Sequence, residues 1–388
     1  MSIALTKASA SVEEAHAAVS VERNVAFDIF KGLAILEVIL HHTLGFSASE
    51  FAIKGTAQWW TYFILQRIFH FAVPAFLLLS ALLMTKSLLE KGQTDWKHFY
   101  TRKAKTILYP YILWTFLYIT MRSFTPDFQM ELTSVQFAFL TFPFPTLLSN
   151  ASDVVRIFLA GKAFYHLYFL AILLQLILIF PVLFYCVRKT SWKLGHWLML
   201  ALSLQVGIYA ILWFFRNWIW QWFPYPASTV FWYIPPILLG LYLGMHWQRW
   251  REIWQKSRVP FGIFATAALS LYLFCEWLFV MKGSVNSRVL NCAFIVYCTS
   301  ISFLLLGLSN SLSKNGRLRS FLSKVGEKSL GLYLIHPAVL AILKRSSISD
   351  ALSILPFSFF ITFFLTLGGT WIIVEGIYRL KFNKLLFG

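Results

Sequence analysis

The feature that most constrains this chain is a series of ten apolar runs, most of them long enough to cross a lipid bilayer. A helix needs about 20 predominantly apolar residues to span the hydrocarbon core. Hydrophobic residues make up 58% of the 388 residues and charged residues only 13%, which excludes an ordinary soluble domain. The sequence therefore predicts an all-α integral membrane protein with about ten transmembrane helices. The runs cover residues 27–46, 57–84, 107–122, 163–187, 196–215, 229–247, 261–281, 289–309, 329–343 and 352–376.

The basic residues are distributed unequally between alternate loops, and this predicts the orientation of the chain. With the N-terminus placed inside, the inner loops and tails hold 23 of the 34 Lys and Arg residues, whereas the outer loops hold 9. Basic residues collect on the cytoplasmic side of membrane proteins. Both termini are therefore predicted to be cytoplasmic, with a tail at 1–22, one membrane domain at 23–379 and a second tail at 380–388. The longest outer loop, 123–162, contains an aromatic stretch at Val135–Leu148 that we expect to be a re-entrant or interfacial element.

Composition also excludes several classes of site. A net charge of +18 would suggest nucleic-acid binding in a soluble protein, but here the basic residues are those of the inner loops, so no nucleic-acid partner is predicted. The four cysteines lie in or beside apolar runs and are interpreted as packing residues. The nine histidines show no metal-binding spacing such as HExxH, and no metal site is predicted.

Three ionisable residues share one stripe of the first run. Lys31 and His42 are 11 residues apart, about three helical turns, and Asp28 lies 14 residues before His42, close to four turns. Ionisable side chains inside a membrane are costly, so they indicate a functional site. We predict that His42, about 16 Å deeper than Lys31, acts as a general base and that Asp28 tunes the charge along the stripe. The alternative is a histidine that only hydrogen-bonds neighbouring helices.

Further polar residues lie in the first two runs and in the seventh. Glu37 and His41 are four residues apart on another face of the first helix, where they can pair with each other. Arg67 and His70 lie just before a proline, whose missing N–H favours a kink. We predict that Glu37, Arg67 and His70 line or support a substrate pocket. For Arg67 the alternative is an anchoring ion pair with Glu37 or another carboxylate. Glu276 is isolated in the seventh run, and no partner can be assigned to it.

Two later motifs contain histidines at a similar predicted depth. Tyr165 and His166 open the fourth run from its outer side, so His166 is predicted to share a pocket with His42 as a second catalytic histidine. The alternative is an interfacial aromatic belt with an embedded histidine. His336 precedes Pro337, which favours a break in the ninth helix. Tyr165 and His336 are therefore also predicted to belong to the pocket.

A basic cluster precedes the third run. Arg102, Lys103 and Lys105 lie at its inner mouth, just before a Tyr-Pro-Tyr motif. The general excess of basic residues on the cytoplasmic side explains them without any further role. The alternative is a phosphate site, because a nucleotide-like donor needs several cations as charge-assisted hydrogen-bond donors.

Taken in this order, the motifs resemble the membrane-bound acyltransferase family 3. The resemblance extends from about residue 23 to residue 379, and many members of the family have Arg where this chain has Lys31. The segments that match are Lys31–His42, Phe71–Ser80, Arg102–Lys105 with Tyr109–Tyr111, Tyr165–Leu170, Gly240–Gly244 and Ser329–Pro337.

The resemblance implies an enzyme that moves acetyl or another short acyl group onto sugars and related acceptors. It implies acetyl-CoA, or another acyl-CoA, as a co-substrate, with no permanently bound cofactor. The phosphates would be bound at the cytoplasmic mouth by Arg102, Lys103, Lys105 and Lys31. His42 would accept the proton of an acceptor hydroxyl that enters from outside, with a covalent acyl-histidine as the alternative. The expected partners are the lipid bilayer, an acyl-CoA and a carbohydrate or glycolipid, and the expected location is a bacterial plasma membrane.

Two other functions are compatible with the same composition. A transporter or flippase for a lipid-linked or exported glycan would use the same polar cavity with alternating access, although no paired halves are evident in the sequence. A membrane scaffold or sensor would give the ionisable stripe no obvious purpose. The identity of the acceptor and the length of the acyl group stay open.

Overall fold

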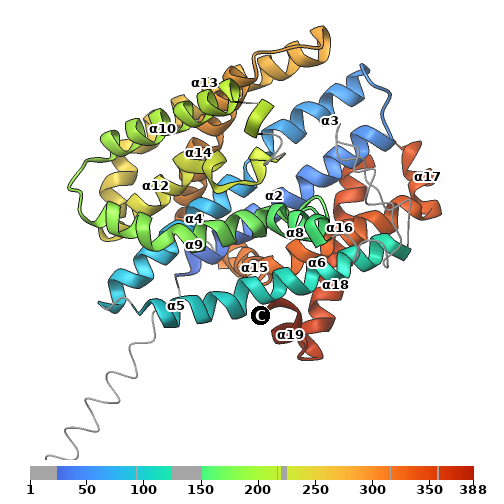
Figure 1. Cartoon of the computed structure of the whole chain (residues 1–388). Helices are drawn as coiled ribbons and strands as arrows, with labels where there is room; N and C mark the ends of the chain where they lie inside the picture. The colour runs from blue at the N-terminus through green and yellow to red at the C-terminus, as the bar shows by residue number, and fades with distance from the viewer. Residues whose placement is uncertain are drawn as a thin grey trace, which may run out of the picture.

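The structure, a computed structural model, consists of helices joined by turns and loops, with no β-strand among its described residues (Figure 1). This confirms the predicted all-α class. The predicted N-terminal tail and the predicted loop element Val135–Leu148 lie outside the described residues. The ranges described are 24–92, 95–124, 151–215, 217–219, 225–314, 316–355 and 358–388.

Short turns join most of the α-helices, which are labelled as in Figure 1. The first half of the chain contains α2 (Val25–Glu50), α3 (Ala57–Ile68), α4 (Ala72–Lys91), α5 (Trp96–Lys103), α6 (Tyr109–Phe124), α8 (Ala151–Ala160), α9 (Tyr168–Arg188) and α10 (Leu194–Phe214). The second half contains α12 (Ile234–Met245), α13 (Trp250–Lys282), α14 (Ser287–Leu312), α15 (Gly316–Glu327), α16 (Ser329–Arg345), α17 (Ser347–Ser353), α18 (Ser358–Arg379) and α19 (Asn383–Phe387). A π-helical turn, Ala104–Leu108, connects α5 to α6, and short 3-10 turns flank α12 at Pro226–Ser228, Val230–Tyr233 and Trp247–Arg249.

Seven helical segments in the described part of the chain are long and apolar enough to cross a membrane. They are α2, the α3–α4 pair, α9, α10, α13 with the turn before it, α14 and α18. The predicted third, sixth and ninth spans correspond to the shorter helices α6, α12 and α16, which have 16, 12 and 17 residues. The chain is therefore a multi-pass membrane protein, whereas the count of ten spans and the side on which the termini lie stay predictions.

Helix α2 lies at the centre of the helical packing. It contacts α3, α4, α14, α15, α16 and α18. Its first turn is capped by Asn24, whose Oδ1 accepts the Ala26 N–H at 3.1 Å. The close crossing of α2 and α15 requires Gly326, because a Cβ there would collide with the carbonyl oxygen of Asp28. Asp28 and Glu37, two polar residues of α2, are buried inside the bundle.

The predicted run 57–84 forms two helices, because residues 69–71 separate α3 from α4. Pro74 lies in the first turn of α4, where its missing N–H costs no hydrogen bond. The free N–H of Phe71 donates to Oε1 of Glu37 on α2 at 3.2 Å. A buried carboxylate on one helix therefore stabilises the break in its neighbour.

The predicted break at Pro337 is wrong, because α16 continues through it. Carbonyl oxygens near the proline accept hydrogen bonds from side chains. The Tyr118 hydroxyl donates to the Leu334 carbonyl at 2.6 Å. Nδ1 of His336 lies 3.0 Å from the Leu332 carbonyl. Such contacts allow a proline inside a membrane helix.

The segment predicted as a C-terminal tail, 380–388, folds back against α6. The Trp114 indole N–H donates to the Leu386 carbonyl at 2.8 Å. Phe387 is buried and stacks with Trp114. The end of the chain therefore packs on the predicted inner half of the bundle.

Candidate active site

Five histidines from four separate segments gather inside the bundle. His41 stacks on His70, at the break between α3 and α4, with ring centroids 4.6 Å apart. His42 stacks on His336 of α16 at 5.4 Å, and His336 lies 5.8 Å from His166, in the turn before α9. No group of three or more His, Cys, Asp or Glu side chains within the described ranges is arranged to hold a metal ion. Since both His42 and His166 contact His336, they lie in the same cluster, as the sequence predicted.

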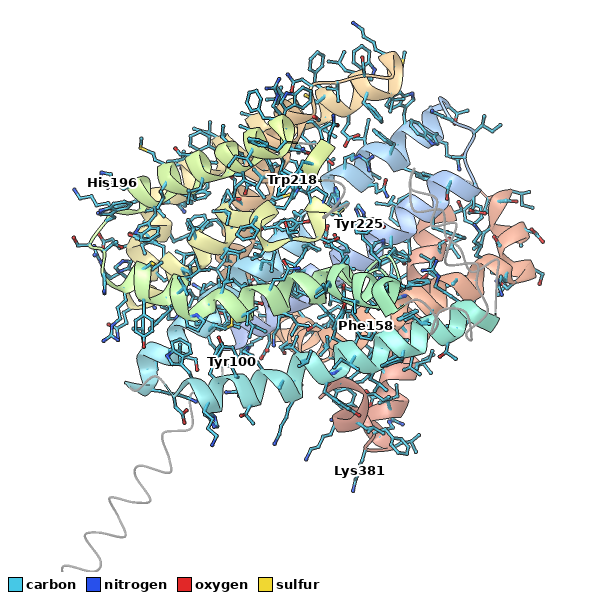
Figure 2. The ribbon with its side chains drawn as sticks, in the orientation of Figure 1. Tyr100, Phe158, His196, Trp218, Tyr225 and Lys381 are labelled. Carbon is cyan, nitrogen blue, oxygen red and sulfur yellow. The ribbon has the colours of Figure 1, made fainter. Side chains whose placement is uncertain are left out.

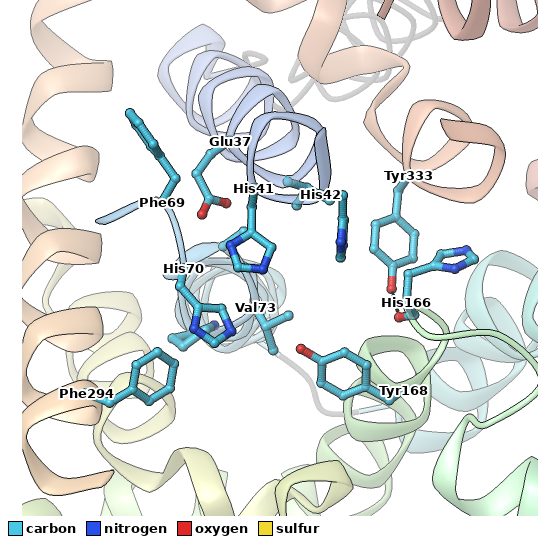
Figure 3. Close-up of a pocket in the computed structure, with 13 residues that line it drawn as sticks. Glu37, His41, His42, Phe69, His70, Val73, His166, Tyr168, Phe294 and Tyr333 are labelled. Carbon is cyan, nitrogen blue, oxygen red and sulfur yellow. Dashed lines mark hydrogen bonds between the residues drawn. The ribbon is translucent and has the colours of Figure 1, made fainter. Parts of the chain in front are cut away.

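A small cavity of about 50 Å³ lies among His41, His42, His70 and His166 (Figure 3), whereas Tyr165 and His336, which were predicted to belong to the pocket, do not line it. His42 is 17 residues beyond the start of α2, which corresponds to about 26 Å along the helix. The volume corresponds to the space of about one to three water molecules. Thirteen residues line the cavity: Glu37, Val38, His41, His42, Phe69, His70, Ala72, Val73, Pro74, His166, Tyr168, Phe294 and Tyr333.

His42 is a candidate for proton transfer within this cavity. Its ring is half-buried and packs between Tyr165, at 4.6 Å, and His336. The ring nitrogens of His166 and Nε2 of His336 have no hydrogen-bond partner among the described residues. The Tyr333 hydroxyl donates to the backbone carbonyl of His166 and so fixes the turn that presents it. Because His42 lines the cavity, its imidazole can accept a proton from a molecule bound there or donate one to it.

Glu37 points into the same cavity (Figure 3). Its Oε1 accepts the Phe71 N–H, and its Oε2 is buried without a partner among the described residues. We expected Glu37 to pair with His41, but Nδ1 of His41 lies 3.0 Å from the Gln66 carbonyl. Glu37 therefore has one oxygen that supports the helix break and one that is buried without a hydrogen-bond partner among the described residues.

Arg67 lies outside the cavity and anchors α3 to α13. Its Nε is 3.1 Å from Oε1 of Glu276, the carboxylate left without a partner in the sequence. One turn before Glu276 on α13, the Tyr272 hydroxyl lies 3.3 Å from Nδ1 of His70. The predicted ion pair of Arg67 is thus present, but Glu276 takes the place of Glu37.

Asp28 and Lys31 are distant from the histidines and outside the lining of their cavity. They form an ion pair of 2.7 Å near the start of α2, with Asp28 largely buried and Lys31 about one-third exposed. Since 14 residues separate Asp28 from His42, the two lie about 21 Å apart along the helix. A direct contact between Asp28 and His42 is therefore excluded.

A larger, basic cavity of about 600 Å³ lies at the other end of α4. Arg102 and Lys103 line it as predicted for a phosphate site, whereas Lys31 and Lys105 do not. Burial, with a smaller effect of the neighbouring Arg102 guanidinium, lowers the pKa of Lys103 to about 8. The full lining is Leu83, Met84, Ser87, Leu88, Lys91, Asp95, His98, Phe99, Arg102 and Lys103.

The sequence analysis missed Lys91 and His98 as members of this basic cavity. His98 is four residues before Arg102, so both share one face of α5. That spacing is the signal by which His98 could have been found. Lys91 lies at the end of α4, three and four residues after Leu88 and Ser87, which line the same cavity.

Comparison with known proteins places the chain in a family. A family model described as an acyltransferase domain, that of acyltransferase family 3, matches residues 24–375. No curated protein and no solved structure matches the chain. The matched range includes the histidine cluster and the basic cavity. The chain therefore belongs to acyltransferase family 3 and is a multi-pass membrane acyltransferase.

Proposed function

We propose that this protein moves an acetyl or other short acyl group from a cytoplasmic acyl-CoA to a hydroxyl of a sugar or glycan at the outer face of the plasma membrane. The main support is the combination of two cavities along α4. The first is basic and lies where the topology prediction places the cytoplasm. The second contains histidines and lies deeper in the membrane domain.

The basic cavity is the proposed site for the anionic part of the donor. Its volume is typical of ligand pockets, which are roughly 300–1,000 Å³. Lys91, Arg102 and Lys103 supply three cations that can form charge-assisted hydrogen bonds with phosphates. Along α4, Leu83 lines this cavity and Pro74 lines the histidine cavity, nine residues away. A donor that uses both must therefore extend over about 14 Å.

The proposed reaction is direct transfer. The acceptor oxygen attacks the carbonyl carbon of the thioester and forms the new C–O bond, while its proton moves to the imidazole of His42. The C–S bond then breaks, and the leaving thiolate takes the proton back from His42. His166 and Tyr168 line the same cavity and are the candidates to stabilise the developing oxyanion.

The test uses the full-length protein in nanodiscs with radiolabelled acetyl-CoA and an extract of membrane glycans. We expect wild type and His196→Ala to transfer label to the glycan and His42→Ala to lose transfer. His196 is a matched control because it is exposed at the start of α10, away from both cavities (Figure 2). If only succinyl-CoA supports transfer, the acetyl assignment is wrong. If no acyl-CoA is consumed while glycan crosses the bilayer, the protein is a flippase.

A further inference from the structure

A third cavity, of about 810 Å³, lies on the side of the bundle and is here called the lateral groove. Residues of α6, α8 and α9, helices that lie next to one another in Figure 1, line it, and Figure 2 labels Phe158 and Tyr225 among the lining residues. Most of the lining is apolar. The residues are Leu108, Tyr111, Ile112, Phe158, Leu159, Ala160, Ala171, Leu174, Gln175, Leu178, Tyr225, Ser228, Thr229 and Phe231.

The rim of the lateral groove faces outward with apolar side chains. Leu159, Leu178 and Phe231 are 70%, 71% and 54% exposed. Since α9 is long and apolar enough to span a membrane, its exposed Leu178 is expected to meet lipid. The one amide in the groove, Gln175, donates to the Ser228 carbonyl at 3.0 Å and accepts a backbone N–H at 2.9 Å. The walls of the groove are therefore suited to a hydrocarbon chain.

Lys162 adjoins the lateral groove at Tyr225, and a second cation, Arg122, bonds the backbone of residues 162 and 163. Nζ of Lys162 is 4.7 Å from the ring centroid of Tyr225 and 5.7 Å from that of Tyr168. Arg122 donates to the Ala163 carbonyl at 3.0 Å. Neither cation has a carboxylate partner in the part of the chain that the structure describes. Such cations in a membrane protein favour an anionic ligand, because aromatic rings compensate them only in part.

The lateral groove and the histidine cavity meet at these aromatic rings. Tyr225 lines the groove, whereas Tyr168 lines the histidine cavity together with His42. Figure 3 shows Tyr168 directed into the space that His42 also borders. Because Lys162 lies over both tyrosines, an anion bound there would be adjacent to the cavity.

We infer that the lateral groove binds the chain of a polyprenyl-phosphate-linked sugar, with its phosphate at Lys162 and Arg122. One undivided groove suits a single hydrocarbon chain better than the two chains of a bilayer phospholipid. A sugar attached to that phosphate would present its hydroxyls to the histidine cavity. The role of this lipid as acyl acceptor rests on the proposed function, whereas its binding does not.

The test is photo-crosslinking of the full-length protein in nanodiscs with a benzophenone-bearing polyprenyl phosphate. We expect label in peptides of α9 and of Tyr225–Phe231. Leu174→Trp, which fills the groove, should lower labelling about tenfold, and Lys162→Gln should remove the preference for polyprenyl phosphate over polyprenol as competitor. Val182→Trp is the matched control, since Val182 lies on α9 outside the groove and is 66% exposed. Melting curves of the variants show whether each one is folded.

Each outcome decides between the occupants. Equal labelling of Leu174→Trp and Val182→Trp, or equal competition by phosphatidylglycerol, would overturn the inference, because the groove would then hold ordinary lipid or nothing specific. Acyl transfer by wild type is measured separately with acetyl-CoA. Specific labelling without any acyl transfer would refute the proposed function but leave the lipid site intact. Transfer that is unaffected by Leu174→Trp would remove the acceptor role of the groove alone.

Discussion

Removal of Glu276 is predicted to be among the most destabilising changes outside the lining of the histidine cavity. Its carboxylate is the ion-pair partner of Arg67, at 3.1 Å, and the side chains are only 11% and 23% exposed. Arg67 also contacts Oε1 of Gln66 at 3.1 Å and lies 4.5 Å from the ring of Phe63. Without Glu276, the guanidinium would keep these contacts but lose its counter-charge.

The magnitude follows from the burial of the pair. Breaking a buried ion pair by removing one partner costs about 3–5 kcal/mol. Because Arg67 keeps two other contacts, we expect Glu276→Leu to lower the free energy of unfolding by about 3 kcal/mol. The double variant Arg67→Met/Glu276→Leu should recover to within about 1 kcal/mol of wild type, since no uncompensated charge remains.

The assay is reversible unfolding in mixed detergent micelles, with a double-mutant cycle. We expect a coupling energy of at least about 2 kcal/mol. The control is the pair Lys344–Glu50, which has a shorter distance of 2.7 Å but side chains 40% and 30% exposed. Its coupling should be below about 1 kcal/mol. If the effects of Arg67→Met and Glu276→Leu simply add, the reasoning about this pair is refuted.

Three further predictions concern packing and donor binding. A Cβ on Gly244 would lie 2.6 Å from the Leu82 carbonyl oxygen of α4, so Gly244→Ala should lower the free energy of unfolding by about 1–3 kcal/mol. The control is Gly207→Ala, which should not destabilise the protein in the same unfolding assay, because Gly207 has open space around it. Arg102→Gln should weaken acetyl-CoA binding about tenfold or more in titration calorimetry, because a charge-assisted hydrogen bond is lost; unchanged affinity would place the donor elsewhere. The pKa of Lys103 is lowered to about 8, so the lysine is mostly charged below that pH and mostly neutral above it. The affinity for acetyl-CoA should therefore fall as pH rises from 7 to 9, and Lys103→Arg should flatten this profile.

Most of the fold followed from apolar run length, and Pro74 predicted a kink close to the break at residues 69–71, but the contact that stabilises this break was not predictable. It depends on Glu37, a residue of another helix, which accepts the Phe71 N–H. The continuity of α16 through Pro337 likewise depends on a hydroxyl from α6, that of Tyr118. Local sequence patterns predict neither contact, because each forms only when separate helices pack together.

The candidate site was predictable where helical spacing alone determines it. The depth of His42 followed from its distance along α2, and its neighbourhood with His166 followed from the predicted direction of the spans. The partner of Arg67 was not predictable, since Glu276 is more than 200 residues away in the sequence. Lys91 lines the basic cavity together with residues of α5, and the sequence does not specify how α4 and α5 lie relative to each other.

The central claim is that His42 transfers the proton during acyl transfer, and its most direct test is the rate constant of the His42→Gln variant. Single-turnover transfer from radiolabelled acetyl-CoA should fall by about 10²–10⁴-fold, as expected for loss of a general base. The dissociation constant of acetyl-CoA should stay within about twofold of wild type, because the basic cavity is unchanged. Transfer within tenfold of the His196→Gln control would contradict this account and move the chemistry away from α2.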